Sequence, residues 1–89
     1  MHNFETEYLS FKRGPDSDSG LTQTWFIYSK NHGDILGKVS WYSAWRQYVF
    51  STRNDPIFNK GCLNDIATFL EDLAHERNMK RAAINLAAG

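Results

Sequence analysis

Hydrophobic residues follow two different periods along this chain. Up to about residue 52 they are mainly aromatic and β-branched and alternate with polar residues, which is typical of β-strands. After residue 61 the apolar positions recur every three or four residues, which is typical of an amphipathic helix. The pattern predicts four strands, over residues 3–12, 23–30, 35–42 and 45–52.

The segments between these strands carry turn residues. Residues 13–22 are rich in Gly, Pro, Asp and Ser, a composition typical of a loop. Residues 31–34 (NHGD) predict a tight turn in which Gly33 supplies a positive φ angle. Ser43-Ala44 predicts a second short turn, and an irregular link separates the last strand from the helical pattern.

The helical stripe predicts one helix from about residue 61 to at least residue 76. Asn59 or Asn64 would cap its start, because an Asn side chain can accept a hydrogen bond from a free N–H of the first turn. Glu76 and Lys80 are spaced for an ion pair on one helix face. The stripe consists of Leu63, Ile66, Ala67, Leu70, Leu73 and Ala74.

Four antiparallel strands followed by one helix predict an α+β fold. The simplest arrangement is a two-layer sandwich, in which the C-terminal helix packs on one face of a four-stranded antiparallel sheet. The length of 89 residues fits one domain. We expect residues 1–77 to form this domain and the Ala-rich residues 78–89 to form a helical or frayed tail.

Two-residue turns at His32-Gly33 and Ser43-Ala44 would set the register of the last three strands and divide their residues between two faces. One face is continuously apolar, and we expect the helix to cover it. It consists of Phe26, Tyr28, Ile35, Val39, Trp41, Tyr48 and Phe50. The other face mixes aromatic and polar residues. It consists of Trp25, Ile27, Leu36, Lys38, Ser40, Tyr42, Trp45, Gln47 and Val49.

The mixed face is the predicted binding surface, because one helix cannot cover both faces of a sheet. Tyr and Trp side chains that are exposed together are typical of interaction sites. Two alternatives remain open from the sequence alone: the first strand and the tail could bury this face, and a one-residue change of register would exchange the faces. The predicted partner-binding residues are Trp25, Lys38, Tyr42, Trp45, Gln47 and Arg46, the last of which is placed near the end of the apolar face.

Charge and cysteine content restrict the partners and the compartment. Lys plus Arg number 10 and Asp plus Glu number 10, so no net field attracts nucleic acid or an anionic membrane. The single cysteine, Cys62, has no intramolecular disulfide partner, which fits a reducing compartment. The chain has no signal-peptide pattern and no apolar run of membrane-spanning length, so we expect a cytoplasmic protein without a membrane partner.

The sequence contains no pattern that points to catalysis or to a bound metal. His2, His32 and His75 lack metal-ligand spacing to one another and to Cys62. The stretch Asp16–Gly20 (DSDSG) lacks the third ligand and the closing Glu of an EF-hand, and we interpret it as a solvated loop. We therefore expect a non-enzymatic protein with no catalytic residues, no metal site and no cofactor.

A further indication comes from aromatic and glycine positions between Trp25 and Leu73. The block WYxxWRxYxF ends at Phe50 and is followed by Gly61-Cys62-Leu63 and Asp65-Ile66. Other positions that carry the pattern are Ser29, Lys30, Gly33, Asp34, Ile35, Leu36, Gly37, Phe58, Phe69 and Leu70. This stretch resembles a family of small proteins of bacteria, phages and prophages that have no assigned activity. The resemblance implies a compact domain of bacterial or phage origin and no particular reaction, and it ends before the tail.

Three hypotheses of function follow. In the first, a small phage-type protein occupies a surface of a host protein, as inhibitors of the anti-CRISPR or anti-restriction type do. In the second, the mixed face binds nucleic acid, with its rings stacked on bases and a basic rim near the phosphates. In the third, the sheet face or the tail forms a homodimer. The basic rim would consist of Lys12, Arg13, Lys30, Lys38, Arg46, Arg53 and Lys60.

Overall fold

The computed structural model of the chain describes residues 3–53 and 55–88 and has the predicted α+β architecture. One antiparallel sheet is followed by one helix, but the sheet is 5-stranded, not four-stranded. The elements are β1 (Phe4–Glu5), β2 (Leu9–Arg13), β3 (Trp25–Ser29), β4 (Ile35–Tyr42), β5 (Gln47–Thr52) and α1 (Lys60–Ala88).

The additional strand arises because a turn interrupts the segment predicted as one strand over residues 3–12. The N–H of Thr6 donates to the carbonyl of Leu9 (2.8 Å), and the N–H of Leu9 donates to Thr6 Oγ1 (3.2 Å). A Thr hydroxyl that bonds a nearby backbone group favours a turn over a continuous strand. The chain therefore reverses, and β1 pairs back onto β2 with Phe4 opposite Phe11.

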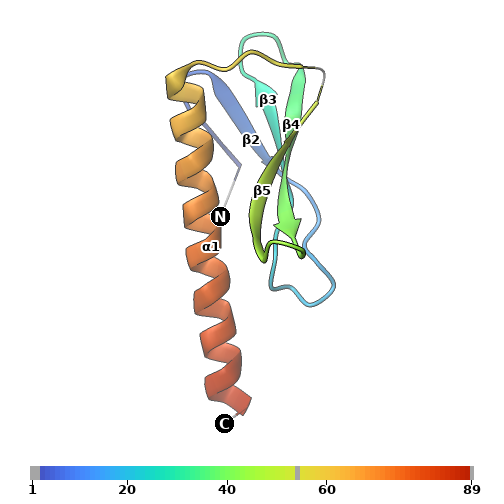
Figure 1. Cartoon of the computed structure of the whole chain (residues 1–89), viewed down its shortest axis with the longest axis vertical. Coiled ribbons are helices and arrows are strands. Elements are labelled where there is room, and N and C mark those ends of the chain that lie inside the picture. The colour runs from blue at the N-terminus through green and yellow to red at the C-terminus, as the bar shows by residue number, and fades with distance from the viewer. Residues whose placement is uncertain (1–2, 54, 89) are drawn as a thin grey trace.

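The strands form an antiparallel meander in the order β1-β2-β3-β4-β5, so each strand pairs with its neighbour in the sequence. Helix α1 follows β5 after a short link and lies along one face of the sheet (Figure 1). Short connections between consecutive elements favour such an arrangement. One layer is the sheet and the other is the helix, and the core lies between them.

This core is largely aromatic. The rings of Phe4 and Phe11 stack with centroids 4.5 Å apart, and Phe69 of α1 lies 4.8 Å from Phe11 and 5.1 Å from Trp25. Burial of large rings is an efficient source of stability in a domain of this size. The buried apolar residues are Leu9, Phe11, Trp25, Ile27, Val39, Tyr48, Cys62, Ile66, Phe69 and Leu73.

Helix α1 begins at an asparagine cap. Oδ1 of Asn59 accepts a hydrogen bond from the N–H of Cys62 (2.8 Å), and the Asn59 carbonyl accepts one from the N–H of Leu63 (3.1 Å). The first bond satisfies a backbone donor of the first turn that has no partner within the helix, and the second is the first i→i−4 bond of the helix. Asn59 is therefore the N-cap, and Asn64 lies inside the helix.

The C-terminal part of α1 projects beyond the sheet (Figure 1). Residues 78–84 are exposed, and the described contacts of α1 with the sheet end near Arg77. Glu76 and Lys80, which are spaced for an ion pair, bond to other elements. Glu76 Oε2 accepts from Gln23 Nε2 (3.1 Å), and Lys80 Nζ donates to the carbonyl of Gly20 (3.4 Å). These bonds tie α1 to the loop before β3.

A β-bulge in β4 changes the register between β3 and β4. Tyr28 pairs with Ile35, whereas Ile27 pairs with Gly37, so Leu36 is an extra residue on β4. An extra residue shifts the alternation of side chains by one position. The register predicted from a two-residue turn at His32-Gly33 was that of two strands paired without a bulge.

The bulge exchanges the predicted faces of β3. Trp25 and Ile27 are buried against α1, and Phe26 and Tyr28 lie on the opposite face. The sequence-based division placed these residues the other way round, and that part of the prediction is wrong. Leu36 likewise packs against the core, although it was predicted on the mixed face.

The turn between β4 and β5 is longer than predicted, but it preserves the faces. Tyr42 pairs with Gln47, so residues 43–46 form the turn, and Val39 lies opposite Phe50 instead of Tyr48. A shift by two residues does not change which side chains share a face. The division between the two faces predicted for β5, and for β4 beyond its bulge, is therefore correct.

Candidate interaction face

The face of the sheet turned away from α1 is the candidate functional site, and we refer to it as the open face. None of its side chains is buried, and Figure 1 shows α1 against the opposite face. An uncovered face with large apolar groups is typical of an interaction surface. The open face consists of Glu5, Ser10, Lys12, Phe26, Tyr28, Ile35, Lys38, Ser40, Tyr42, Gln47, Val49 and Ser51. Ile35 was predicted on the face covered by the helix, but it pairs with Tyr28 and lies on the open face with it.

An exposed aromatic pair marks the corner of the open face next to the β4–β5 turn. The rings of Tyr42 and Trp45 meet edge to face, with centroids 4.9 Å apart and planes at 88°. Tyr42 is 43% exposed and Trp45 is 66% exposed. The turn holds this geometry, since the N–H of Trp45 donates to the carbonyl of Tyr42 (3.2 Å). The pair therefore presents a large apolar surface that is already positioned.

Most of the predicted binding residues lie at or beside this corner. Lys38, Tyr42 and Gln47 belong to the open face, and Gln47 lies directly opposite Tyr42. Trp45 and Arg46 lie in the adjoining turn, where both are exposed and Arg46 has a φ angle of 53°. Their role in binding a partner remains a prediction.

Trp25 is the exception, and its predicted exposure is wrong. It is 0% exposed, and its indole packs edge-on against Phe69 of α1. Its Nε1–H donates to Oε1 of Gln23 (2.9 Å), so its polar atom is also satisfied inside the protein. The β4 bulge places it on the helix side, where no partner can reach its ring.

Two open-face aromatics were assigned to the core by the sequence pattern. Phe26 and Tyr28 are half-buried and lie beside lysines: Lys38 is opposite Phe26, and Lys12 Nζ lies 5.0 Å from the centroid of the Tyr28 ring. A cation over an aromatic face is a weakly stabilising arrangement. Alternation alone could not place these rings, because the bulge that moves them has no clear sequence signal apart from Gly37.

Acidic residues are absent from four of the five strands of the sheet. Strands β2 to β5 contain no Asp or Glu, although the chain as a whole has equal numbers of acids and bases. Lys12 and Lys38 are the charged side chains of the open face on these strands. The acidic residues lie in β1, the loops and α1. Glu5 of β1 lies opposite Ser10 at one edge of the open face, so the face is locally cationic only away from that edge.

A buried polar network lies on the opposite side of the sheet, at its junction with α1. Gln23 is 3% exposed, and its backbone N–H donates to the hydroxyl of Tyr48 (3.0 Å). The Gln23 side chain accepts from Trp25 and donates to Glu76. Each polar group of this buried side chain thus has a partner, as interior polar groups require.

Burial raises the pKa of Tyr48 above its ordinary value of 10.0, because the charged phenolate is poorly solvated there. The hydrogen bond from Gln23 and the nearby Arg77 charge act in the opposite direction, and the carboxylates of Glu76 and Asp16 add to the increase in pKa. The hydroxyl is protonated at neutral pH. Tyr48 therefore serves the core as a neutral hydrogen-bond acceptor.

The other residues considered from the sequence do not form a chemical site among the described residues. Cys62 is buried in the core, and no described group of His, Cys, Asp and Glu could hold a metal ion. His2 lies outside the described residues. In the DSDSG loop, Ser17 Oγ accepts from the N–H of Thr22 (3.2 Å), so this polar side chain stabilises the loop itself. Within the described residues, α1 is not apolar enough over its length to cross a membrane.

Comparison with known proteins gives one informative similarity. The chain is 29% identical over 72 residues to an uncharacterized 9.3 kDa protein of Acholeplasma phage L2, and the match covers 81% of this chain and 91% of that protein. No protein-family model matches the chain. No solved structure matches it either. The similarity is consistent with a phage origin and carries no activity with it.

Proposed function

We propose that this chain is a non-enzymatic binding protein that occupies a surface of a host protein through its open face. The exposed Tyr42–Trp45 pair carries this proposal. Both residue types are enriched at the centres of protein interfaces, because a large rigid ring buries much area at a small cost in side-chain entropy. The pair is fixed by its turn and by its ring contact before any partner arrives.

The surroundings of the pair also suit a protein partner. Gln47, Ser40 and Lys38 offer polar and charged groups next to the rings, which is the usual composition of an interface with an apolar centre and a polar rim. A regular sheet face loses little conformational entropy on binding, since its backbone is already hydrogen bonded. Lys38 and Arg46 favour a partner whose complementary surface is acidic.

We propose a bacterial defence complex as the partner class, with the chain as an inhibitor of the anti-CRISPR or anti-restriction type. The similarity to a phage protein supports this context, because a phage chain of 89 residues that binds a host machine can act by blocking its surface. This step rests on the phage origin and on size rather than on a particular contact.

The test combines plating efficiency with co-purification. In a bacterium with an active restriction or CRISPR system, the tagged wild-type chain should raise the plating of a targeted phage and should co-purify with one component of that system. Replacing Tyr42 and Trp45 together by Ala should weaken both effects by about tenfold or more, as loss of a central aromatic pair does. Ile57→Ala is the matched control, because Ile57 is 98% exposed and lies in the link outside the open face.

The outcomes separate cleanly. If the double variant has the wild-type circular dichroism spectrum and still inhibits and co-purifies as the wild type does, the open face is not the contact surface. If the wild-type chain neither changes plating nor retains a component of either system, the proposed partner class is wrong.

Single-stranded nucleic acid is a second candidate partner, favoured by the absence of carboxylates from β2–β5. Phe26, Tyr28 and Tyr42 would stack on bases, and Lys12 and Lys38 would contact phosphates. Binding should then weaken steeply with salt. Mobility shifts with Lys12→Gln and Lys38→Gln, against the control Lys60→Gln at the start of α1, distinguish this candidate from a protein partner.

Formation of a homodimer is a third candidate function, and it can be tested with the same purified protein. Light scattering at increasing concentration would give a dimer mass if a second copy covers the open face, and the Tyr42/Trp45 double variant would then be a monomer. A monomer mass for the wild type leaves the open face available to other partners.

A further inference from the structure

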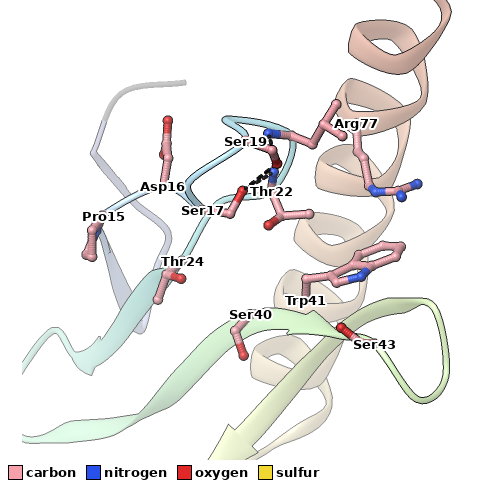
Figure 2. Close-up of a pocket in the computed structure, with 11 residues that line it drawn as sticks. Pro15, Asp16, Ser17, Ser19, Thr22, Thr24, Ser40, Trp41, Ser43 and Arg77 are labelled. Atoms are coloured by element: carbon pink, nitrogen blue, oxygen red, sulfur yellow. Dashed lines mark hydrogen bonds between the residues drawn. The ribbon is translucent and has the colours of Figure 1, made fainter.

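A second site lies apart from the open face, in a cleft between the β2–β3 loop, the end of β4 and α1. The cleft has a volume of about 540 Å³. Figure 2 shows the loop hydroxyls on one side and Trp41 and Arg77 on the other. Its volume falls within the roughly 300–1,000 Å³ of small-molecule sites. The lining residues used below are Ser17, Thr22, Thr24, Ser40, Ser43 and Arg77.

Arg77 is the cation among the residues that line this cleft. Its guanidinium carbon lies 4.0 Å from the centroid of the Trp41 ring, so the group is stacked on the indole and held in place. Nε of Arg77 is buried and has no hydrogen-bond partner among the described residues. A buried donor without an acceptor is unfavourable, and an anionic ligand would satisfy Nε after a small shift of the Arg77 side chain, because this atom is closed to solvent in the structure.

The carboxylates nearest to the cleft are already bonded to other groups. Asp16 lines the cleft but forms a close ion pair with Arg13, at 2.8 Å and 3.0 Å from Nη2. Glu76 bonds the side chain of Gln23 in the buried network. Among residues 3–53 and 55–88, no carboxylate is in hydrogen-bond contact with Arg77.

The hydroxyls of the cleft supply further donors. The side chains of Thr22, Thr24, Ser40 and Ser43 make no hydrogen bond within the described part of the chain, so their O–H groups are available to a ligand. Hydroxyl donors that line the same cleft as a fixed guanidinium suit a phosphate group better than a carboxylate, because a phosphate group has three terminal oxygens to satisfy. The remaining space is lined by hydroxyls and suits the polar remainder of a small phosphorylated molecule.

From this arrangement we infer that the cleft binds the phosphate group of a small phosphorylated molecule, with Arg77 as the charged anchor. Trp41 holds the guanidinium in place, and the loop and β4 hydroxyls bond the remaining oxygens and the polar remainder of the molecule. The inference does not depend on the Tyr42–Trp45 pair or on the proposed partner, because Arg77 and Trp41 lie outside the open face; Ser40 is the one residue that borders both sites.

The test is an NMR titration that follows the Arg77 Nε–H signal of the ¹⁵N-labelled wild-type chain. Inorganic phosphate and ribose 5-phosphate are the probes, and sodium acetate and sodium chloride at matched ionic strength are the controls. We expect a saturable shift of the Arg77 signal and of the Trp41 indole signal with the phosphates only, and tighter binding of ribose 5-phosphate because its hydroxyls fill more of the cleft.

Two variants assign the effect to Arg77. Arg77→Gln should weaken phosphate binding by about tenfold or more, since it removes the charge-assisted hydrogen bonds. Arg81→Gln, one turn further along α1 and exposed, should bind as the wild type does. A shift that does not saturate, a saturable shift with acetate alone, or equal binding by a folded Arg77→Gln variant would overturn the inference. The wild-type titration decides the question even if Arg77→Gln does not fold.

Discussion

At the scale of single residues, Gly37 allows β5 to pack closely against β4. A Cβ atom at this position would collide with the carbonyl oxygen of Ser51 and lie 2.8 Å from the Phe50 ring. No side chain fits there without moving the backbone of β5, so the neighbouring strand packs closely only because position 37 is glycine. The sequence shows this glycine but not the contact that requires it.

Gly37→Ala should therefore destabilise the fold by about 1–3 kcal/mol, the usual cost of forcing an extra atom into a packed site. Urea unfolding followed by fluorescence measures the change. Gly61→Ala is the matched control, because its new Cβ meets nothing closer than 3.4 Å and alanine favours a helix. Equal stability of Gly37→Ala and wild type would show that β5 relaxes freely at this point.

The raised pKa of Tyr48 predicts that the free energy of unfolding decreases in alkaline solution. Its folded-state pKa lies above the ordinary 10.0, so above that pH the unfolded chain releases this proton more readily than the folded chain does. The contribution of Tyr48 is thus fully present below pH 10.0 and is lost as the pH rises through its folded-state pKa.

Urea midpoints measured from neutral pH to beyond pH 10.0 test this behaviour. Tyr48→Phe should be less stable than wild type by about 1 kcal/mol at neutral pH, through the lost bond to Gln23, and should decline less steeply in alkali. Tyr42→Phe, on the exposed face, should keep the wild-type slope. Identical slopes for Tyr48→Phe and wild type would contradict the assignment.

At the scale of elements, α1 depends on its cap and on its packed face. Cys62, Ile66, Phe69 and Leu73 recur at helical spacing and are all buried against the sheet. This periodicity is visible in the sequence, as is the presence of an asparagine near the start. The sequence does not distinguish Asn59 from Asn64, because the choice depends on where the backbone leaves the helical conformation.

Asn59→Ala should cost about 0.5–2 kcal/mol of unfolding free energy, because it removes the side-chain bond to the N–H of Cys62. Asn59→Asp should retain most of the stability. Asn64→Ala, inside the helix, should be neutral or slightly stabilising. Thermal unfolding followed by circular dichroism would reveal the opposite order if Asn64 were the cap.

At the scale of the whole molecule, the sheet and the first part of α1 form the packed body, and the end of α1 projects from it. The longest dimension is 48 Å, comparable to the length of the 29-residue helix at about 1.5 Å per residue. The side chains of residues 78–84 are exposed, so this segment contributes little apolar burial.

Ending the chain after Arg81 should therefore change the free energy of unfolding by less than about 1 kcal/mol, because the removed side chains that the structure describes, at residues 82–84, are exposed. Chemical unfolding of the shortened chain measures this. Leu73→Ala, at a position that is 0% exposed, is the contrasting variant and should cost about 2–5 kcal/mol. A similar loss from the truncation would show that the segment beyond Arg81 belongs to the core.

The sequence by itself determined the kinds of elements, their order, part of the helical face of α1 and the partition of β5 between the two sides of the sheet. These properties depend on the local periodicity of apolar residues, which is the same in the sequence whatever tertiary contacts the segment makes. Ile66 and Leu73 of the predicted stripe are buried, whereas Leu63 and Ala67 are exposed. The sequence pattern did not predict the turn at Thr6 or the bulge at Leu36.

Only the tertiary structure decided which aromatic rings remain exposed. Trp25 is buried and Tyr28 is on the open face because one bulged residue exchanges the sides of a strand, and α1 then covers the side with the larger continuous apolar surface. The cleft around Arg77 likewise depends on three segments that are distant in the sequence and meet only when the helix packs on the sheet.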